Sequence, residues 1–174
     1  MAEREGLGSL DVPESIYGFA QAAEATMAWM YRTAAQLADN PKSRVGLEHL
    51  ATAEDSHARK LAEVYPAIAS AIDADDGPSE WTISRLRKEM IPNLDVNSLG
   101  SLLITAYRIE QGGCEFYGRW AEVSARPEAR RVAEHLRTQE SQHRKAIAAR
   151  YRDEFGTDIE GEPEAHESIP WPRW

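Results

Sequence analysis

The sequence predicts an all-α protein whose centre is a four-helix bundle with one long crossover connection, and three observations support this fold class. Long segments rich in helix-forming residues are separated by turns that contain proline. An early part of the chain is repeated later, and each copy contains two of these segments. The copies are joined by roughly 25 residues, a link long enough to cross from one end of a bundle to the other.

The first two helices are predicted on either side of a proline turn. The first extends from about Glu14 to Asp39, after the helix-start signals in DVPES. The sequence DNPKS then forms a turn in which Pro41 suits a first helical position. The second helix extends from Lys42 to about Ile72, where DADDGPSE ends it.

The connection and the last two helices follow the same logic. Within the connection, EWTISRLRKEM predicts a short helix. Asn97 or Ser98 can cap a third helix that extends to about Ala125. The sequence ARPEA repeats the proline turn, and a fourth helix is predicted from about Glu128 to Phe155.

The chain is expected to form one domain, because 174 residues with 42% hydrophobic and 28% charged residues suit a single globular core. We assign residues 14–155 to the bundle and residues 1–13 to an N-terminal extension. Residues 156–174 form a C-terminal tail that is too rich in Pro and Glu to be helical throughout.

Composition argues against several classes of protein. The net charge of −9 is unfavourable for nucleic-acid binding, which needs clustered Lys and Arg. The single Cys114 excludes an internal disulfide and a cysteine-based zinc site, and it favours a reducing compartment. We see neither a signal-peptide h-region nor an apolar run long enough to span a membrane. We therefore expect a cytoplasmic protein that is not bound to a membrane.

An internal repeat relates the two halves of the bundle. Shifted by 86 residues, residues 14–65 align with residues 100–151 without a gap, and 15 of the 52 positions are identical, where about three would be expected by chance. The identical pairs include Glu24 and Glu110, Tyr31 and Tyr117, Pro41 and Pro127, Thr52 and Thr138, Tyr65 and Tyr151, and the two EHL sequences. Two copies of a helix pair can pack about a pseudo-twofold axis as a four-helix bundle.

The repeat contains two Glu-x-x-His motifs that predict a metal site. Glu54 and His57 form the first motif, Glu140 and His143 form the second, and each motif follows another glutamate by 30 residues. Residues three apart lie on one face of a helix, here a stripe of otherwise apolar residues that should face the bundle interior. Unpaired charge in that interior costs several kcal/mol.

Metal ions would compensate this charge. Four carboxylates and two imidazoles supply enough donor atoms for two ions, and oxygen with imidazole nitrogen suits iron or manganese. The alternative is a set of ion pairs left by a duplication that has lost its metal. The six candidate ligands are Glu24, Glu54, His57, Glu110, Glu140 and His143.

At these residues the chain resembles the ferritin-like superfamily, and within it the rubrerythrins and related erythrins, over about Glu14 to Phe155. The resemblance implies a ferritin-like bundle in which the six candidate residues bind two iron ions, with manganese or a mixed Mn/Fe pair as alternatives. It also implies that Glu54 and Glu140 bridge the ions and that Tyr31 and Tyr117 form hydrogen bonds to ligand carboxylates.

The implied function is reduction of hydrogen peroxide or dioxygen by ferrous iron, as in a peroxidase or ferroxidase. Two departures from the rubrerythrin pattern matter. Gly113 stands where rubrerythrins carry an additional glutamate, and no rubredoxin domain is present, so an external electron donor would be needed. The alternatives are a diiron oxygenase or oxidase acting on an organic substrate, and a ferritin-like iron-storage protein. The sequence EGLGSL faintly resembles the docking peptides of encapsulin cargo.

The sequence also allows predictions for several further residues. Gly112 and Gly113 permit either close helix packing or an open space beside the metals for a small molecule. Cys114 is expected in the core, whereas His49 and His135 are expected at an interface or on the surface.

The C-terminal tryptophans predict how the tail is used. Two exposed tryptophans would leave a large apolar area in water, so Trp171 and Trp174 should be docked. The proline spacing in IPWPRW gives an extended segment able to reach over the bundle or onto a neighbouring chain. We expect a homodimer with this tail at its interface or on its outer surface.

Overall fold

The computed structural model describes residues 14–64, 91, 94–169 and 171, and its described part is a bundle of four long helices with no β-strand. In chain order the helices are α1 (Glu14–Leu37), α2 (Pro41–Val64), α5 (Leu99–Val123) and α6 (Pro127–Phe155). Two short 3₁₀ helices follow, η1 (Ile159–Gly161) and η2 (Pro163–His166).

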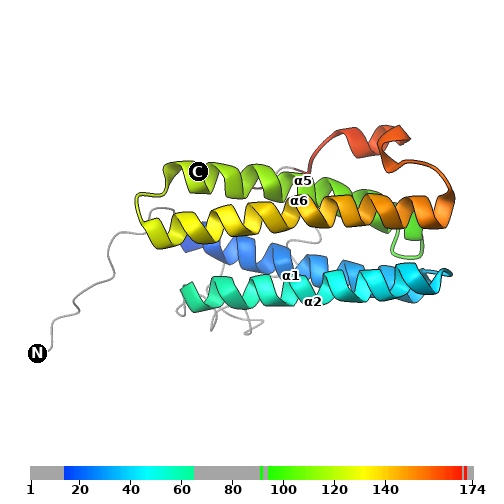
Figure 1. Cartoon of the computed structure of the whole chain (residues 1–174), viewed down its shortest axis with the longest axis horizontal. Helices are drawn as coiled ribbons and strands as arrows, with labels where there is room; N and C mark the ends of the chain where they lie inside the picture. Colours follow the sequence, from blue (N-terminus) through cyan, green and yellow to red (C-terminus); the bar gives the residue numbers. More distant parts are fainter. Residues whose placement is uncertain (1–13, 65–90, 92–93, 170, 172–174) are drawn as a thin grey trace, which may run out of the picture.

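The helices pack as two pairs that lie against each other (Figure 1). The helix α1 packs along α2, and α5 packs along α6. The pairs then meet through contacts between α1 and α5 and between α2 and α6. The predicted all-helical bundle is therefore confirmed, with the two copies of the repeat as its two layers.

Local sequence signals explain most of the helix ends. Ser98 is the N-cap of α5 and accepts a hydrogen bond from the backbone N–H of Ser101 at 3.2 Å. The helix α6 ends at Gly156, which adopts the left-handed conformation with φ of 71°. The first helix ends at Leu37, two residues before the predicted end. The predicted continuation of the second helix to Ile72, and the predicted short helix in residues 80–90, lie outside the described residues.

Both proline turns are closed in the same way, as expected for copies of one unit. The guanidinium of Arg44 donates a hydrogen bond to the carbonyl oxygen of Ala38 at 2.9 Å. In the second copy, Arg130 donates to the carbonyl oxygen of Ser124 at 2.8 Å. Each arginine thus satisfies a carbonyl group at a helix C-terminus that has no partner within the helix.

The core between the layers combines small residues on α1 with aromatic residues on α5. Alanines dominate the buried face of α1, whereas Phe116, Tyr117 and Trp120 are completely buried on α5. Small side chains allow the helices to approach, and the large rings fill the space that remains. No described helix is long and apolar enough to span a membrane.

The tail after Gly156 folds back onto its own bundle (Figure 1). The backbone N–H of Ile169 donates to the carbonyl oxygen of Arg108 on α5 at 3.1 Å. Trp171 is buried, which confirms that it is docked, whereas Trp174 lies outside the described residues. The partner of the docked tail in this structure is the chain's own bundle.

Candidate metal centre

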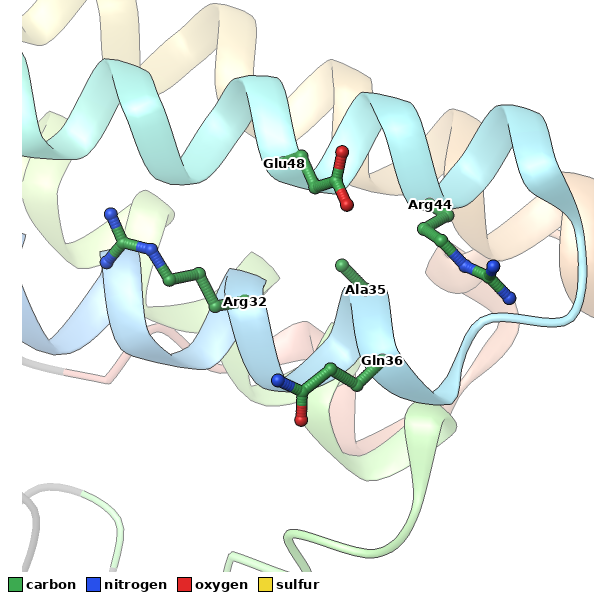
Figure 2. A pocket seen from close by; sticks show the side chains of 5 residues that line it. All are labelled: Arg32, Ala35, Gln36, Arg44 and Glu48. Atoms are coloured by element: carbon green, nitrogen blue, oxygen red, sulfur yellow. The ribbon is translucent and has the colours of Figure 1, made fainter.

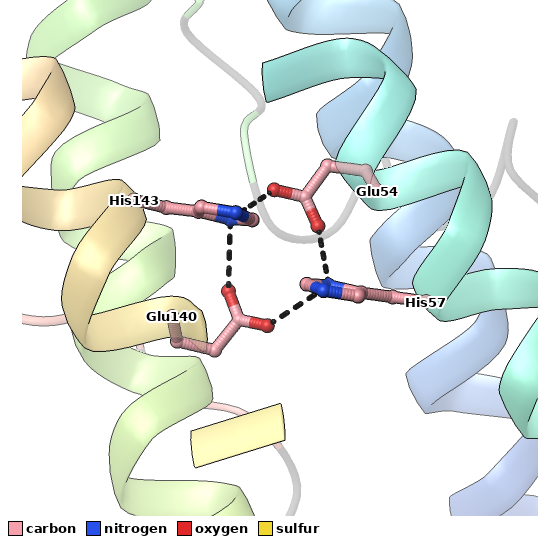
Figure 3. Close-up of side chains that lie close together, drawn as sticks. All are labelled: Glu54, His57, Glu140 and His143. Carbon is pink, nitrogen blue, oxygen red and sulfur yellow. Dashed lines mark ion pairs between the residues drawn. The ribbon is translucent and has the colours of Figure 1, made fainter. Parts of the chain in front are cut away.

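Two glutamates and two histidines form a closed ring in the bundle interior (Figure 3). Glu54 and His57 project from α2, and Glu140 and His143 project from α6. One candidate ligand atom from each of the four residues lies within 4.8 Å of the other three, and all four residues are buried. Each pair shares a helix face because its members are three residues apart. This group could hold a metal ion.

Each ring carboxylate faces both histidines. One oxygen of Glu54 lies 3.0 Å from Nδ1 of His57, and the other lies 2.6 Å from Nδ1 of His143. The oxygens of Glu140 lie 3.5 Å from Nδ1 of His57 and 4.0 Å from Nδ1 of His143. The imidazole rings are stacked with centroids 5.2 Å apart. The carboxylates of Glu54 and Glu140 therefore both span the gap between the two imidazoles.

The other two predicted ligands approach the ring from α1 and α5. Glu24 lies 3.3 Å from Nδ1 of His57, and Glu110 lies 3.7 Å from Nδ1 of His143. Both side chains are almost completely buried. The structure thus brings together all six predicted residues, although only Glu54, His57, Glu140 and His143 form the tightest group.

Two tyrosines hold the outer carboxylates across the layers. Tyr31 of α1 donates its hydroxyl hydrogen to Glu110 of α5, and Tyr117 of α5 donates to Glu24 of α1. The two bonds are related by the internal repeat. Burial and the nearby carboxylates raise the pKa of both phenols well above its usual value of 10. Each tyrosine therefore remains a protonated hydrogen-bond donor.

The ring histidines are held in their charged form. Burial by itself lowers the pKa of His57, but the nearby carboxylates of Glu24 and Glu54 raise it to about 9. Burial is likewise outweighed at His143, where Glu110 and Glu54 raise the pKa to about 11. In the protein without metal, the imidazole nitrogens that face the carboxylates therefore carry protons.

The ring carboxylates behave differently from Glu24. Burial and the charge of Glu110 raise the pKa of Glu54 to about 8, and the same two causes raise the pKa of Glu140 well above its usual range. Burial also acts on Glu24, but His57 outweighs it and lowers the pKa of that carboxyl. A cation between the carboxylates would relieve their mutual repulsion.

Several buried oxygen and nitrogen atoms at the centre have no hydrogen-bond partner among the described residues. Although ion-pair distances are short, hydrogen-bond geometry is missing for both oxygens of Glu54, one oxygen each of Glu110 and Glu140, and Nδ1 of His143. Buried polar atoms are normally paired, and each exception needs an explanation. Carboxylate oxygens and imidazole nitrogens that converge on one place fit the ligand preference of iron and manganese once the protons are displaced. The residues present therefore fit a metal centre.

The space left by the two glycines of α5 is filled by the tail. A Cβ atom on Gly112 would lie 2.1 Å from the carbonyl oxygen of Ile169, and one on Gly113 would lie 3.3 Å from the ring of Trp171. The glycines thus permit close packing of the tail, and the space is not open. Sequence reasoning expected Trp171 to be docked but did not place it beside Glu140. The sequence repeat did indicate a difference here, because the first copy carries bulkier residues at the positions that correspond to the two glycines.

Other singled-out residues lie away from the ring. His49 and His135 are exposed, and Nε2 of His135 lies 2.9 Å from Nζ of Lys60. Cys114 is half-buried rather than in the core, because its thiol faces the carbonyl oxygen of Arg137 at the surface of α6. Burial raises the pKa of this thiol to about 11, so it is a poor nucleophile at neutral pH. Tyr65 and the sequence EGLGSL lie outside the described residues.

An open pocket lies on the outer side of α1 and α2 (Figure 2). Its lining consists of Arg32, Ala35, Gln36, Arg44 and Glu48. Both arginines have structural partners, since Arg32 forms a hydrogen bond to Asp55 and Arg44 caps α1. None of the lining residues belongs to the ring, and we assign this pocket no function.

The candidate metal centre rests on the geometry of this chain. No protein-family model, curated protein or solved structure matches the sequence or the fold.

Proposed function

We propose that this chain is a ferritin-like diiron protein, most similar to the rubrerythrins, that reduces hydrogen peroxide or dioxygen. Glu24, Glu54, His57, Glu110, Glu140 and His143 would hold two iron ions. The observation that carries the proposal is that Glu54 and Glu140 each face both histidines with separate oxygens. Carboxylates placed between two imidazoles in this way would hold two ions as a pair.

Two bound ferrous ions would supply the two electrons that, with two protons, reduce hydrogen peroxide to two water molecules. The chain's own residues prepare the site for this chemistry. Tyr31 and Tyr117 orient Glu110 and Glu24 by hydrogen bonds to their carboxylates. The buried aromatic residues of α5 exclude bulk water from the same region. An external donor would restore the ferrous state, since the chain holds no cysteine set for a second iron centre.

The filled space beside Glu140 favours a small oxidant over an organic substrate. An oxygenase needs a pocket next to its metals for the substrate. Here Trp171 occupies the space next to Gly113, where the glycines in the sequence had suggested such a pocket. This contact supports peroxide or dioxygen as the molecule that reaches the ions.

Metal analysis and rapid kinetics test the proposal together. We expect two iron ions per chain after anaerobic loading, and oxidation of the ferrous site by peroxide and by dioxygen in stopped-flow absorbance. Because Gly113 replaces a carboxylate, we expect a weaker preference for peroxide than rubrerythrins show. Release of ferric iron from the site after oxidation would indicate iron storage instead. A chain that binds neither iron nor manganese would overturn the proposal.

A further inference from the structure

The two copies of the repeat close the metal centre differently. At the offset of 86 residues, Gly112 and Gly113 of α5 correspond to Thr26 and Met27 of α1. Thr26 and Met27 are buried, so α1 fills its side of the core with its own side chains. On the α5 side, the tail with Trp171 fills the corresponding space. The cover on one side is thus part of a long helix, whereas the other side is covered by a separate segment.

The indole of Trp171 fits this space closely. A Cβ atom on Gly113 would lie 3.3 Å from the indole and 3.2 Å from Cγ of Glu140. A single side-chain position therefore separates the indole from a proposed ligand. Phe19, Phe116 and Tyr117 surround the indole with ring centroids 5.3, 5.0 and 5.6 Å away. We call the place bounded by Gly112, Gly113 and these three rings the indole seat.

Among the described residues, two hydrogen bonds to Arg108 hold the part of the tail next to Trp171. The carbonyl oxygen of Arg108 accepts a hydrogen bond from the backbone of Ile169 at 3.1 Å, and its side chain donates to the carbonyl oxygen of Glu167 at 2.7 Å. The indole N–H of Trp171 is buried and has no hydrogen-bond partner among the described residues. An unpaired buried donor gains a partner in water, which favours departure of the ring from the seat.

We propose that Trp171 is the specificity-determining residue of this site. Seated, its indole limits access from the α5 side to molecules as small as dioxygen or hydrogen peroxide. When the tail leaves, the indole seat is an aromatic-lined binding site next to Glu140 for a flat aromatic molecule of indole size. The identity of the small molecules rests on the proposed function, whereas the existence of the seat does not.

Indole itself is the probe for the seat, used with the full chain free of metal. Trp171→Ala should bind indole in calorimetry or ligand-observed NMR, and the wild-type chain should not bind it at the same concentration, because its own side chain occupies the seat. Trp29→Ala is the matched control, since it removes a half-buried tryptophan from α1. Equal indole binding by all three proteins, or by none, would overturn the proposal.

A second test displaces the tail without changing Trp171. A Cβ atom in Gly112→Ala would lie 2.1 Å from the carbonyl oxygen of Ile169, so the tail must move. The control on the same helix is Gly100→Ala, whose Cβ would lie 3.6 Å from Phe155, an ordinary contact. Tryptophan fluorescence should shift to the red in Gly112→Ala and stay unchanged in Gly100→Ala. The shift should be absent when Trp171→Ala is added to Gly112→Ala.

The third test measures access to bound iron with bipyridyl, a flat aromatic chelator. Ferrous iron should be lost to bipyridyl at least about tenfold faster from Trp171→Ala and Gly112→Ala than from the wild type. A seated state that is favoured over the open state by about 1.4 kcal/mol slows the loss by this factor. The Gly100→Ala chain should match the wild type. Equal rates in all variants would show that Trp171 does not limit access.

The three tests separate the two proposals. If the wild-type chain holds no iron, the proposed function fails, while indole binding and fluorescence still decide whether the seat exists. If iron binds and all variants release it alike, the proposed function stands and the role of Trp171 fails. Should Trp171→Ala not fold, Trp171→Leu offers the same comparison with a smaller loss of apolar area.

Discussion

Tyr31 donates its hydroxyl hydrogen to Glu110 across the interface between the two copies of the repeat. The equivalent bond runs from Tyr117 to Glu24 in the opposite direction. Each copy therefore positions a carboxylate that belongs to the other copy. This exchange couples the packing of α1 and α5 to the geometry of the metal centre, because neither carboxylate can turn without losing its donor.

Replacing these tyrosines by phenylalanine should weaken metal binding. Phenylalanine preserves the ring and the volume but removes the donor, which leaves the carboxylate free to turn. We expect Tyr31→Phe and Tyr117→Phe each to lower iron affinity by about 10- to 100-fold, measured by competition with a chelator. The matched control is Tyr107→Phe, because the hydroxyl of Tyr107 donates to Glu160 of the tail. An affinity unchanged in both site variants would contradict the orienting role.

Replacing a glutamate of the closed ring should lower the metal content, whereas replacing a surface glutamate should not. In Glu54→Ala or Glu140→Ala, at least one of the two ions should be lost, since each carboxylate faces both histidines. Elemental analysis of the loaded protein measures this directly. The control Glu48→Ala removes an exposed glutamate from α2 and should retain both ions. Full occupancy in both ring variants would refute the ligand assignment.

The stability of the metal-free protein should fall as the pH rises. The pKa values of His57 and His143 are raised from 6.5 to about 9 and about 11, so their contribution is complete below pH 6.5 and is lost as the pH passes through those values. The pKa of Glu54, raised from 4.5 to about 8, acts with the same sign, because the folded state binds a proton that the unfolded state releases. Urea unfolding between about pH 6 and pH 9 should show this decline.

Metal binding should release these protons. Iron or manganese must displace the protons from the imidazoles and the carboxyl groups before it binds. Titration calorimetry in buffers with different ionisation enthalpies should therefore report net proton release at pH 7, and the apparent affinity should rise with pH. Binding without proton release would show that the ions occupy some other group of residues.

Removal of residues 168–174 should destabilise the chain. The truncation deletes the buried Ile169 and Trp171 and exposes the glycine-lined face of α5. Loss of one buried tryptophan side chain costs about 3–5 kcal/mol, and we expect a fall of at least that size in the free energy of unfolding. All six proposed ligands lie on the helices, so the truncated protein should still bind two iron ions.

The homodimer remains a prediction that sedimentation can test alongside this truncation. Because the tail packs on its own bundle, we expect the shortened chain to remain dimeric. Dissociation of the shortened chain would place the tail at the dimer interface.

Local chemistry in the sequence was sufficient to predict the helices and the main polar residues of the centre. Proline turns and the Ser98 cap locate helix ends because they act through backbone groups a few residues away. The repeat predicted that Glu54 and His57 correspond to Glu140 and His143. Because the spacing is the same in both copies, the two pairs lie on equivalent faces of their helices. The structure then shows one ligand atom from each of these four residues within 4.8 Å of the others.

Tertiary packing alone decided what fills the space over Gly112 and Gly113. A pair of glycines in the sequence indicates only that side chains are missing there. It does not indicate which distant segment packs against the two glycines. The tail reaches α5 through hydrogen bonds to Tyr107 and Arg108 and through burial of Trp171 among aromatic rings. These aromatic contacts join residues that are between 54 and 152 positions apart in the sequence. They carry no sequence period, because apolar packing depends on shape and not on spacing along the chain.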